Sequence, residues 1–276
     1  MKRYAIILTL CAAALAAAPV FAGKAITVKG SDTMVILGQR WAEKFMNANS
    51  GQVIMVTGGG SGTGIAALIN GTTDICQSSR SMKEDEKLKL RDRYQTMGIE
   101  IPVAKDGLAV YVHTTNPVKE LSVAQLGEIY LGNITNWKQV GGPDATIILY
   151  GRENSSGTYG FFKEHVLKNK DFSARVQTLP GTAAVVNAVA KDPNGIGYGG
   201  AAYAKGVRDL GMKKDAGSAA VLPVAATVKD GSYPLSRPLF FYLRKSPSGD
   251  TKKFVDWVLS AEGQKLAVEV GYFPLN

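Results

Sequence analysis

The apolar residues of this chain follow two different periods, which alternate along the sequence. Gln52–Thr57 is almost continuously apolar, as in a strand of a parallel sheet that is covered on both faces. A helical spacing precedes it and is carried by Met34, Leu37, Trp41 and Phe45. Further along, the apolar run Thr146–Tyr150 comes before another helical pattern, over Tyr159–Leu167. Strands that alternate with helices predict an α/β protein.

The middle of the chain continues this alternation without a break in composition. Ile101–Ala104 and Gly107–Val112 are further strand-like runs, and Thr182 is placed to cap a helix over Ala183–Ala190. Neither a flexible linker nor a low-complexity segment divides the sequence. If the protein has two lobes, strands therefore have to cross between them.

Three predicted strand-to-helix turns are rich in glycine and hydroxyl residues. They are Gly30–Met34, Gly58–Gly64 and Gly151–Thr158, and the last two share the sequence Ser-Gly-Thr. A helix start exposes unpaired N–H groups and the positive end of the helix dipole. Arg152 adds a planar guanidinium, whose paired N–H donors suit an oxyanion. Ordinary helix capping explains one such turn at least as well. Three of them, all at the carboxyl ends of strands, indicate an anion site.

The first 22 residues have the features of a signal peptide, with Lys2 and Arg3 before an apolar stretch. Val20–Ala22 supplies small residues at the positions that a signal peptidase recognises, so we expect export and cleavage after Ala22. No other run is long and apolar enough to span a bilayer. The remaining chain keeps one cysteine, Cys76, which we interpret as a small buried apolar residue rather than a nucleophile.

The length of the chain and its net charge exclude few classes of partner. The 276 residues suffice for one large or two modest domains, and the formal net charge is +9. In an exported protein this charge gives little support for a nucleic-acid partner. A positive field would concentrate a small anion, although general surface charge accounts for it equally well.

The common catalytic and cofactor motifs are absent from the sequence. It has no Gly-Lys-Ser/Thr of a Walker loop, and Gly62–Ala67 fits only the loosest form of the dinucleotide fingerprint. His113 and His165 have no acidic cluster near them in the sequence, and no candidate base stands near Ser61 or Ser156. We therefore predict no catalytic residue, no metal ion and no cofactor. The polar groups look like binding groups.

The chain resembles the periplasmic phosphate-binding proteins, the solute receptors of high-affinity phosphate ABC transporters. The resemblance spans the chain after the signal peptide and is carried, in order, by the segments Gly30–Met34, Gly58–Gly64, Gln77–Arg80, Gln125–Gly132, Ile134–Trp137, Arg152–Thr158 and Tyr233–Leu239. It implies a type II periplasmic-binding-protein fold, in which two α/β lobes are joined by two crossing strands and enclose the ligand. Lobe one would comprise residues 23–105 and 238–276, and lobe two residues 106–237.

The resemblance also implies the ligand, the partners and the binding residues. The ligand would be inorganic phosphate, the partner an ABC permease in the inner membrane, the location the periplasm, and the protein a monomer without a nucleic-acid partner. The predicted phosphate-binding residues are Ser31, Asp32, Thr33, Met34, Ser61, Ser79, Arg80, Arg152, Ser156, Gly157 and Thr158.

One position departs from the pattern of the best-known members. Those members have an aspartate where Ser79 stands, and its carboxylate accepts the proton of hydrogen phosphate and so excludes sulfate. We hypothesise that Asp32, in the facing turn, replaces this acceptor. Arg80 could add a second positive charge to the site or pair with Asp32, and the sequence leaves both roles open.

Other functions remain as alternatives. Another tetrahedral oxyanion, such as molybdate or sulfate, would suit the same kind of site. A secreted phosphatase would need a metal cluster or a base beside a serine, and the sequence displays neither. An additional sensing or adhesion role would leave the fold unchanged.

Overall fold

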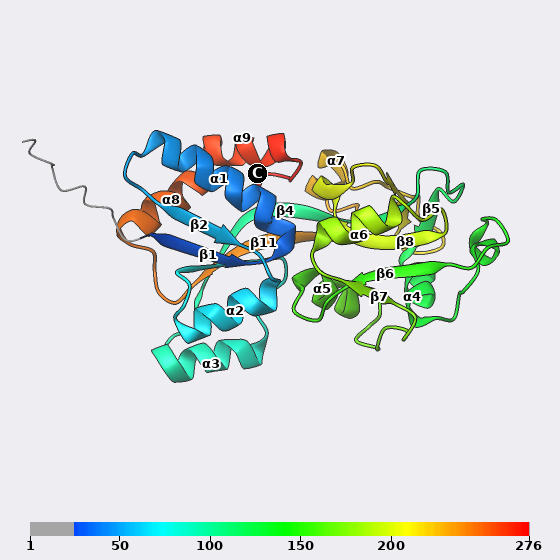
Figure 1. Cartoon of the computed structure of the whole chain (residues 1–276), viewed down its shortest axis with the longest axis horizontal. Coiled ribbons are helices and arrows are strands. Elements are labelled where there is room, and N and C mark those ends of the chain that lie inside the picture. The colour runs from blue at the N-terminus through cyan, green and yellow to red at the C-terminus, as the bar shows by residue number, and fades with distance from the viewer. Residues whose placement is uncertain (1–24, 276) are drawn as a thin grey trace, which may run out of the picture.

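In this computed structural model, which describes residues 25–275, the chain forms two α/β lobes that lie side by side (Figure 1). The predicted α/β class with two lobes is confirmed. The predicted signal peptide, residues 1–22, lies outside the described residues.

The regular elements alternate along the chain as the apolar pattern predicts. The strands are β1 (Ile26–Gly30), β2 (Ile54–Thr57), β3 (Ile75–Ser78), β4 (Ile99–Val112), β5 (Glu120–Ser122), β6 (Ile148–Arg152), β7 (Gln177–Leu179), β8 (Gly195–Gly200), β9 (Arg208–Asp209), β10 (Gly211–Lys213) and β11 (Ser236–Leu243). The α-helices are α1 (Val35–Ala48), α2 (Ser61–Asn70), α3 (Glu84–Tyr94), α4 (Val123–Leu131), α5 (Gly157–His165), α6 (Thr182–Val189), α7 (Ala225–Lys229), α8 (Gly249–Leu259) and α9 (Ala261–Val270). Short 3-10 helices cover Asp32–Met34, Trp137–Val140 and Ala201–Tyr203.

A single sheet runs through both lobes. Within residues 25–275 it has nine strands in the order β2-β1-β3-β11-β4-β8-β6-β7, with β9 paired to β4. Strands β1, β2 and β3 are parallel to one another, whereas β11 is antiparallel to β3 and to β4. In Figure 1, β4 and β11 pass from one lobe to the other. They are the two crossing strands.

The separate strands predicted at Ile101–Ala104 and Gly107–Val112 are one strand, so that prediction was wrong. Strand β4 runs without interruption from Ile99 to Val112. Lys105 and Asp106 stand between the two runs, and Asp106 is the buried one. It stays within the strand because Arg237 lies opposite it in β11 and forms an ion pair with it at 2.8 Å. A charge can occupy a buried strand when it is paired in this way.

Strand β2 lies at the edge of the sheet, which corrects the prediction that it is covered on both faces. It pairs only with β1 among the described strands. Met55 in the strand is 49% exposed, and Val53, directly before it, is 43% exposed. The apolar run therefore reflects a strand with one buried face whose outer positions also happen to be apolar.

The buried cores divide along the crossing strands. In lobe one, α1, α8 and α9 cover one face of the sheet, and α2 and α3 cover the other (Figure 1). The buried core residues of this lobe come from 26–104 and 239–272, and those of lobe two from 108–235. We propose that the lobes are divided at residues 105/106 and 237/238, between these sets.

Cys76 is fully buried in β3, as its interpretation as an apolar residue requires. Burial raises the pKa of its thiol far above the ordinary value, which outweighs the opposing effect of Arg80. The group therefore stays a neutral thiol and is a poor nucleophile.

The Asp209 carboxyl in β9 is held in the fold at a cost in stability. Its Oδ1 is buried without a hydrogen-bond partner among the described residues, and burial raises its pKa from 3.8 to about 6, against the opposing charge of Arg208. The folded state thus binds this proton more tightly than the unfolded chain does. Ionised Asp209 destabilises the fold above pH 6, and the cost is relieved as the pH falls toward 3.8.

We expect Asp209→Asn to raise the free energy of unfolding by about 2 kcal/mol at pH 8 and to change it little at pH 4. Urea unfolding at the two pH values measures the difference. Asp92→Asn, at an exposed carboxylate of α3, is the control and should show no such dependence. An equal effect of Asp209→Asn at both pH values would contradict the argument.

Candidate functional site

The three hydroxyl-rich turns come together where the two lobes meet. In lobe one they follow β1 and β2, and Ser79 directly follows β3. In lobe two the turn follows β6 and leads into α5. Because the carboxyl ends of parallel strands share one edge of a sheet, strands within each lobe deliver their turns to the same place.

Direct hydrogen bonds join the turns across the lobes. Thr33 Oγ1 and Thr158 Oγ1 lie 2.9 Å apart, and both side chains are buried. The Gly62 N–H donates to the carbonyl oxygen of Ser155 over 2.8 Å. The two Ser-Gly-Thr segments therefore face each other.

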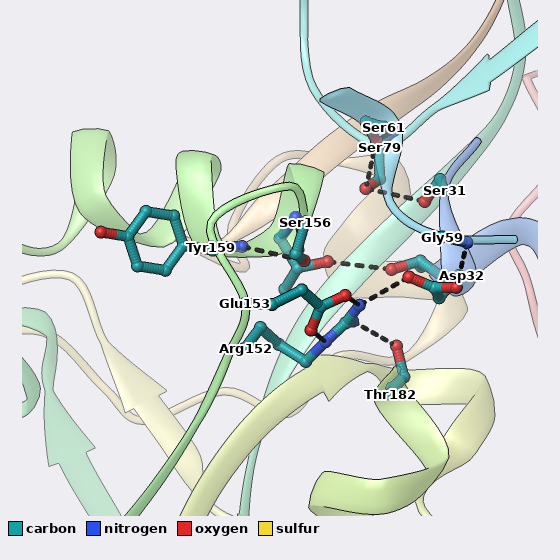
Figure 2. Close-up of polar contacts among 12 residues, drawn as sticks. Ser31, Asp32, Gly59, Ser61, Ser79, Arg152, Glu153, Ser156, Tyr159 and Thr182 are labelled. Carbon is teal, nitrogen blue, oxygen red and sulfur yellow. Dashed lines mark hydrogen bonds and ion pairs between the residues drawn. The ribbon is translucent and has the colours of Figure 1, made fainter. Parts of the chain in front are cut away.

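Three serines of lobe one form a buried cluster beside these contacts (Figure 2). Ser31 Oγ donates to Ser79 Oγ over 2.9 Å, and the Ser79 N–H donates to Ser61 Oγ over 3.1 Å. None of the three residues is more than 1% exposed. Ser79 is thus positioned with the other predicted site residues, but it offers a hydroxyl in place of a carboxylate.

The start of α5 presents small residues to this serine cluster. Ser156 is its N-cap, since Ser156 Oγ accepts from the N–H groups of Thr158 and Tyr159. A Cβ on Gly157 would lie 2.2 Å from Ser61 Oγ and 2.6 Å from Ser79 Oγ. The close approach of the lobes at this point requires a glycine.

Arg152 is a buried cation of the site, with its side chain 1% exposed. Figure 2 shows its guanidinium between Asp32, Glu153 and Thr182. Nη2 lies 2.8 Å from Asp32 Oδ2 and 2.8 Å from Glu153 Oε1, and Nη1 donates to Thr182 Oγ1 over 2.8 Å. Burial alone would raise the pKa of Glu153, but the hydrogen bond and charge of Arg152 lower it below its ordinary value. Glu153 is therefore an ionised partner of Arg152.

The Thr182 contact corrects a prediction, because Thr182 is not the N-cap of α6. Gly181 occupies that position, and Thr182 is the first helical residue. Its hydroxyl is used by Arg152 instead.

Asp32 lies in the 3-10 turn of lobe one and connects it to several neighbours. Its Oδ1 accepts from the Gly59 N–H over 2.8 Å, while its Oδ2 accepts from Arg152 across the lobes. The Tyr203 hydroxyl donates to the Asp32 carbonyl oxygen over 2.7 Å. Each carboxylate oxygen keeps a further lone pair.

In the same turn, the Met34 N–H donates to the Ser31 carbonyl oxygen over 3.0 Å, and the Met34 side chain is part of the core of lobe one.

Arg80 does not pair with Asp32, which removes one of the two roles left open by the sequence. Its guanidinium binds Glu86 in a two-pronged contact of 2.7 and 2.8 Å. Arg80 lines a cavity of about 550 Å³ between the lobes, together with Ser79, Ser156 and Arg237. It is near the serine cluster, but its charge is already compensated.

Several residues at the site were not predicted from the sequence. Arg237 and Asp106 form a buried ion pair, and Arg237 also donates to Thr158 Oγ1 over 3.0 Å. Glu153 and Thr182 hold Arg152. The available signals were the position of Arg237 within a family-like segment and the charged pair Lys105–Asp106 between two apolar runs.

Within residues 25–275, no group of three or more His, Cys, Asp and Glu side chains is arranged to hold a metal ion. In that part of the chain no helix has both the length and the apolar character needed to cross a bilayer.

Known proteins resemble this chain in sequence and in structure. Residues 16–262 match the model of a family described as a PBP superfamily domain. The PstS phosphate-binding protein of Pseudomonas aeruginosa is 35% identical, covering 89% of this chain and 81% of that protein. The corresponding protein of Staphylococcus haemolyticus is 37% identical, covering 86% of this chain and 75% of that protein.

Two solved structures extend the comparison to the fold. A phosphate ABC transporter substrate-binding protein with bound phosphate from Clostridium perfringens superposes with a TM-score of 0.83 at 29% identity, covering 91% of this chain and all (100%) of that one. An ABC-type phosphate transport receptor from Vibrio cholerae gives a TM-score of 0.73 at 30% identity, covering 90% and 99%. This chain therefore belongs to the PBP superfamily and, within it, to the family of the PstS phosphate-binding proteins.

Proposed function

We propose that this protein is an exported receptor that binds inorganic phosphate between its lobes and delivers it to an ABC transporter permease in the inner membrane. The observation that carries the proposal is the meeting of the Ser-Gly-Thr turn of α5 with the turns of lobe one, beside a buried arginine. Lobe closure would bring donors from both sides onto one anion, and the ligand would favour the closed state.

The donors at this meeting point suit an oxyanion. The hydroxyls of Thr33, Ser61 and Thr158 come from two lobes, and Arg152 supplies a guanidinium. Because Asp32 and Glu153 already compensate the charge of Arg152, hydrogen bonds rather than net charge would hold the ligand. Burial makes such bonds strong, since an unmade bond is not replaced by water.

We include all residues of the predicted site in this proposal. They are Ser31, Asp32, Thr33, Met34, Ser61, Ser79, Arg80, Arg152, Ser156, Gly157 and Thr158. We also propose that the protein acts as a monomer without catalytic activity, binds no nucleic acid, and is processed after Ala22. Mass spectrometry of the secreted form tests the processing. Light scattering tests the monomeric state.

Calorimetry of the ligand-stripped protein, starting at residue 23, tests the function. We expect submicromolar binding of phosphate, much weaker binding of sulfate and molybdate, and no release of product from phosphate esters. Tight sulfate or molybdate binding would favour the receptor for another oxyanion, and turnover of an ester would favour the phosphatase.

The selectivity for phosphate tests Asp32 as the acceptor of the ligand's proton. We expect Asp32→Asn to reduce the preference for phosphate over sulfate by about a hundredfold, because an amide facing the anion no longer rejects a ligand without a proton. Titration with both anions at pH 7 measures the ratio, and Asp85→Asn, in exposed α3, is the control. A ratio unchanged by Asp32→Asn would disprove this role.

A further inference from the structure

Arg237 lies at the point where the crossing strands and the anion site meet. It stands in β11 directly opposite Asp106 of β4, and the two residues are 3% and 1% exposed. Arg237 Nε and Nη2 donate to Asp106 Oδ2 over 3.0 and 2.8 Å. Burial raises the pKa of Asp106 above its ordinary value, while the charge and hydrogen bonds of Arg237 act against that rise.

The same guanidinium also holds the first turn of α5. Nη2 donates to Thr158 Oγ1 over 3.0 Å, and the guanidinium carbon lies 5.2 Å from the centre of the Phe161 ring, one turn further along the helix. Nη1 is buried without a hydrogen-bond partner among the described residues. Arg237 therefore connects a crossing strand to the helix start that carries Ser156, Gly157 and Thr158.

The contact determines how the Thr158 hydroxyl can act. A guanidinium only donates, so Thr158 Oγ1 is the acceptor in this bond and keeps its own hydrogen for another partner. Thr33 Oγ1 lies 2.9 Å away on the other side, in the direction of lobe one. A hydroxyl that accepts from a cation is also a stronger donor, since linked hydrogen bonds polarise one another.

We propose that Arg237 is a positioning residue for anion binding, which turns the Thr158 hydroxyl into a donor toward the ligand and fixes α5 to the crossing strands. This inference rests on the proposed function and assigns its site a residue that does not itself touch the anion. Asp106 has a matching role, because its charge compensates Arg237 and limits the attraction that Arg237 exerts on the anion.

A double-mutant cycle of Arg237→Lys and Thr158→Val tests the proposal by phosphate calorimetry. Lysine keeps the charge but has no planar fork to hold Asp106 and Thr158 together. We expect each single variant to bind phosphate roughly tenfold more weakly, and the double variant to bind about as weakly as Thr158→Val alone. A merely structural role of Arg237 would instead give losses that multiply, and this outcome would overturn the proposal.

Asp106→Asn provides a second test that does not depend on replacing the arginine. It removes the compensating charge but keeps the shape and an acceptor for Arg237. We expect it to lower the midpoint of thermal unfolding and yet to tighten phosphate binding at least about threefold. Weaker or unchanged phosphate binding by this variant would contradict the assigned role.

Titration of the wild-type protein with phosphate distinguishes a failure of the proposed function from a failure of the role assigned to Arg237. If the unaltered protein binds no phosphate, both the proposed function and this inference fail. If it binds phosphate but the cycle is additive, only the inference fails.

Discussion

Replacing Arg152 by alanine is expected to weaken phosphate binding by about 4 kcal/mol, or roughly a thousandfold. The substitution removes the buried guanidinium fork from the site. It also leaves Asp32 and Glu153, which each lie 2.8 Å from Nη2, without their shared cation. Two uncompensated carboxylates would then face the incoming anion, so the loss exceeds that of one hydrogen bond.

Calorimetry or competition with labelled phosphate measures this loss. Arg175→Ala is the matched control, because it removes the same charge from an exposed position of lobe two. Adding Asp32→Asn to Arg152→Ala should recover part of the affinity by removing one of the exposed charges. A loss below tenfold for Arg152→Ala would show that the anion does not depend on this guanidinium.

Gly157→Ala is expected to weaken phosphate binding roughly a hundredfold, although alanine favours a helix more than glycine does. In the structure the added methyl group would lie 2.2 Å from Ser61 Oγ and 2.9 Å from Ser61 Cβ. A hydroxyl can rotate away, but a Cβ cannot. The lobes would therefore have to stay further apart than they lie in this structure.

Gly160→Ala, in the same helix, is the control for this prediction. Its added methyl group would meet Arg80 Cδ at 3.2 Å, which belongs to a flexible side chain. Calorimetry measures the affinities, and small-angle scattering with and without phosphate reports on closure. Wild-type affinity of Gly157→Ala would mean that the turns do not approach this closely when ligand is bound.

The elements of the fold were predictable because their periodicity is local. The helical spacing over Met34–Phe45 and the cap-like turn before α5 both depend on residues a few positions apart, and both appear in the structure. The same holds for the hydroxyl-rich turns, whose common place at the carboxyl ends of strands follows from the α/β pattern.

The contacts among these elements were not predictable, because they join residues far apart in the chain. Asp32 and Arg152 are 120 positions apart, and Asp106 and Arg237 are 131 apart. The spacing of residues along the sequence does not show which two charged side chains will lie opposite each other in a sheet. For the same reason the charged pair Lys105–Asp106 divided β4 into two predicted strands, and the edge position of β2 was not visible in its apolar sequence.

The crossing strands also set an order in which the protein can fold as it is synthesised. Strand β4 supplies the template for β8 and β9 of lobe two, so this lobe has all of its strands once the first residues of β11 have been made. Lobe one begins earlier in the chain but lacks β11, α8 and α9 until the last segment emerges. Since β11 pairs with both β3 and β4, the lobe that starts first is completed last.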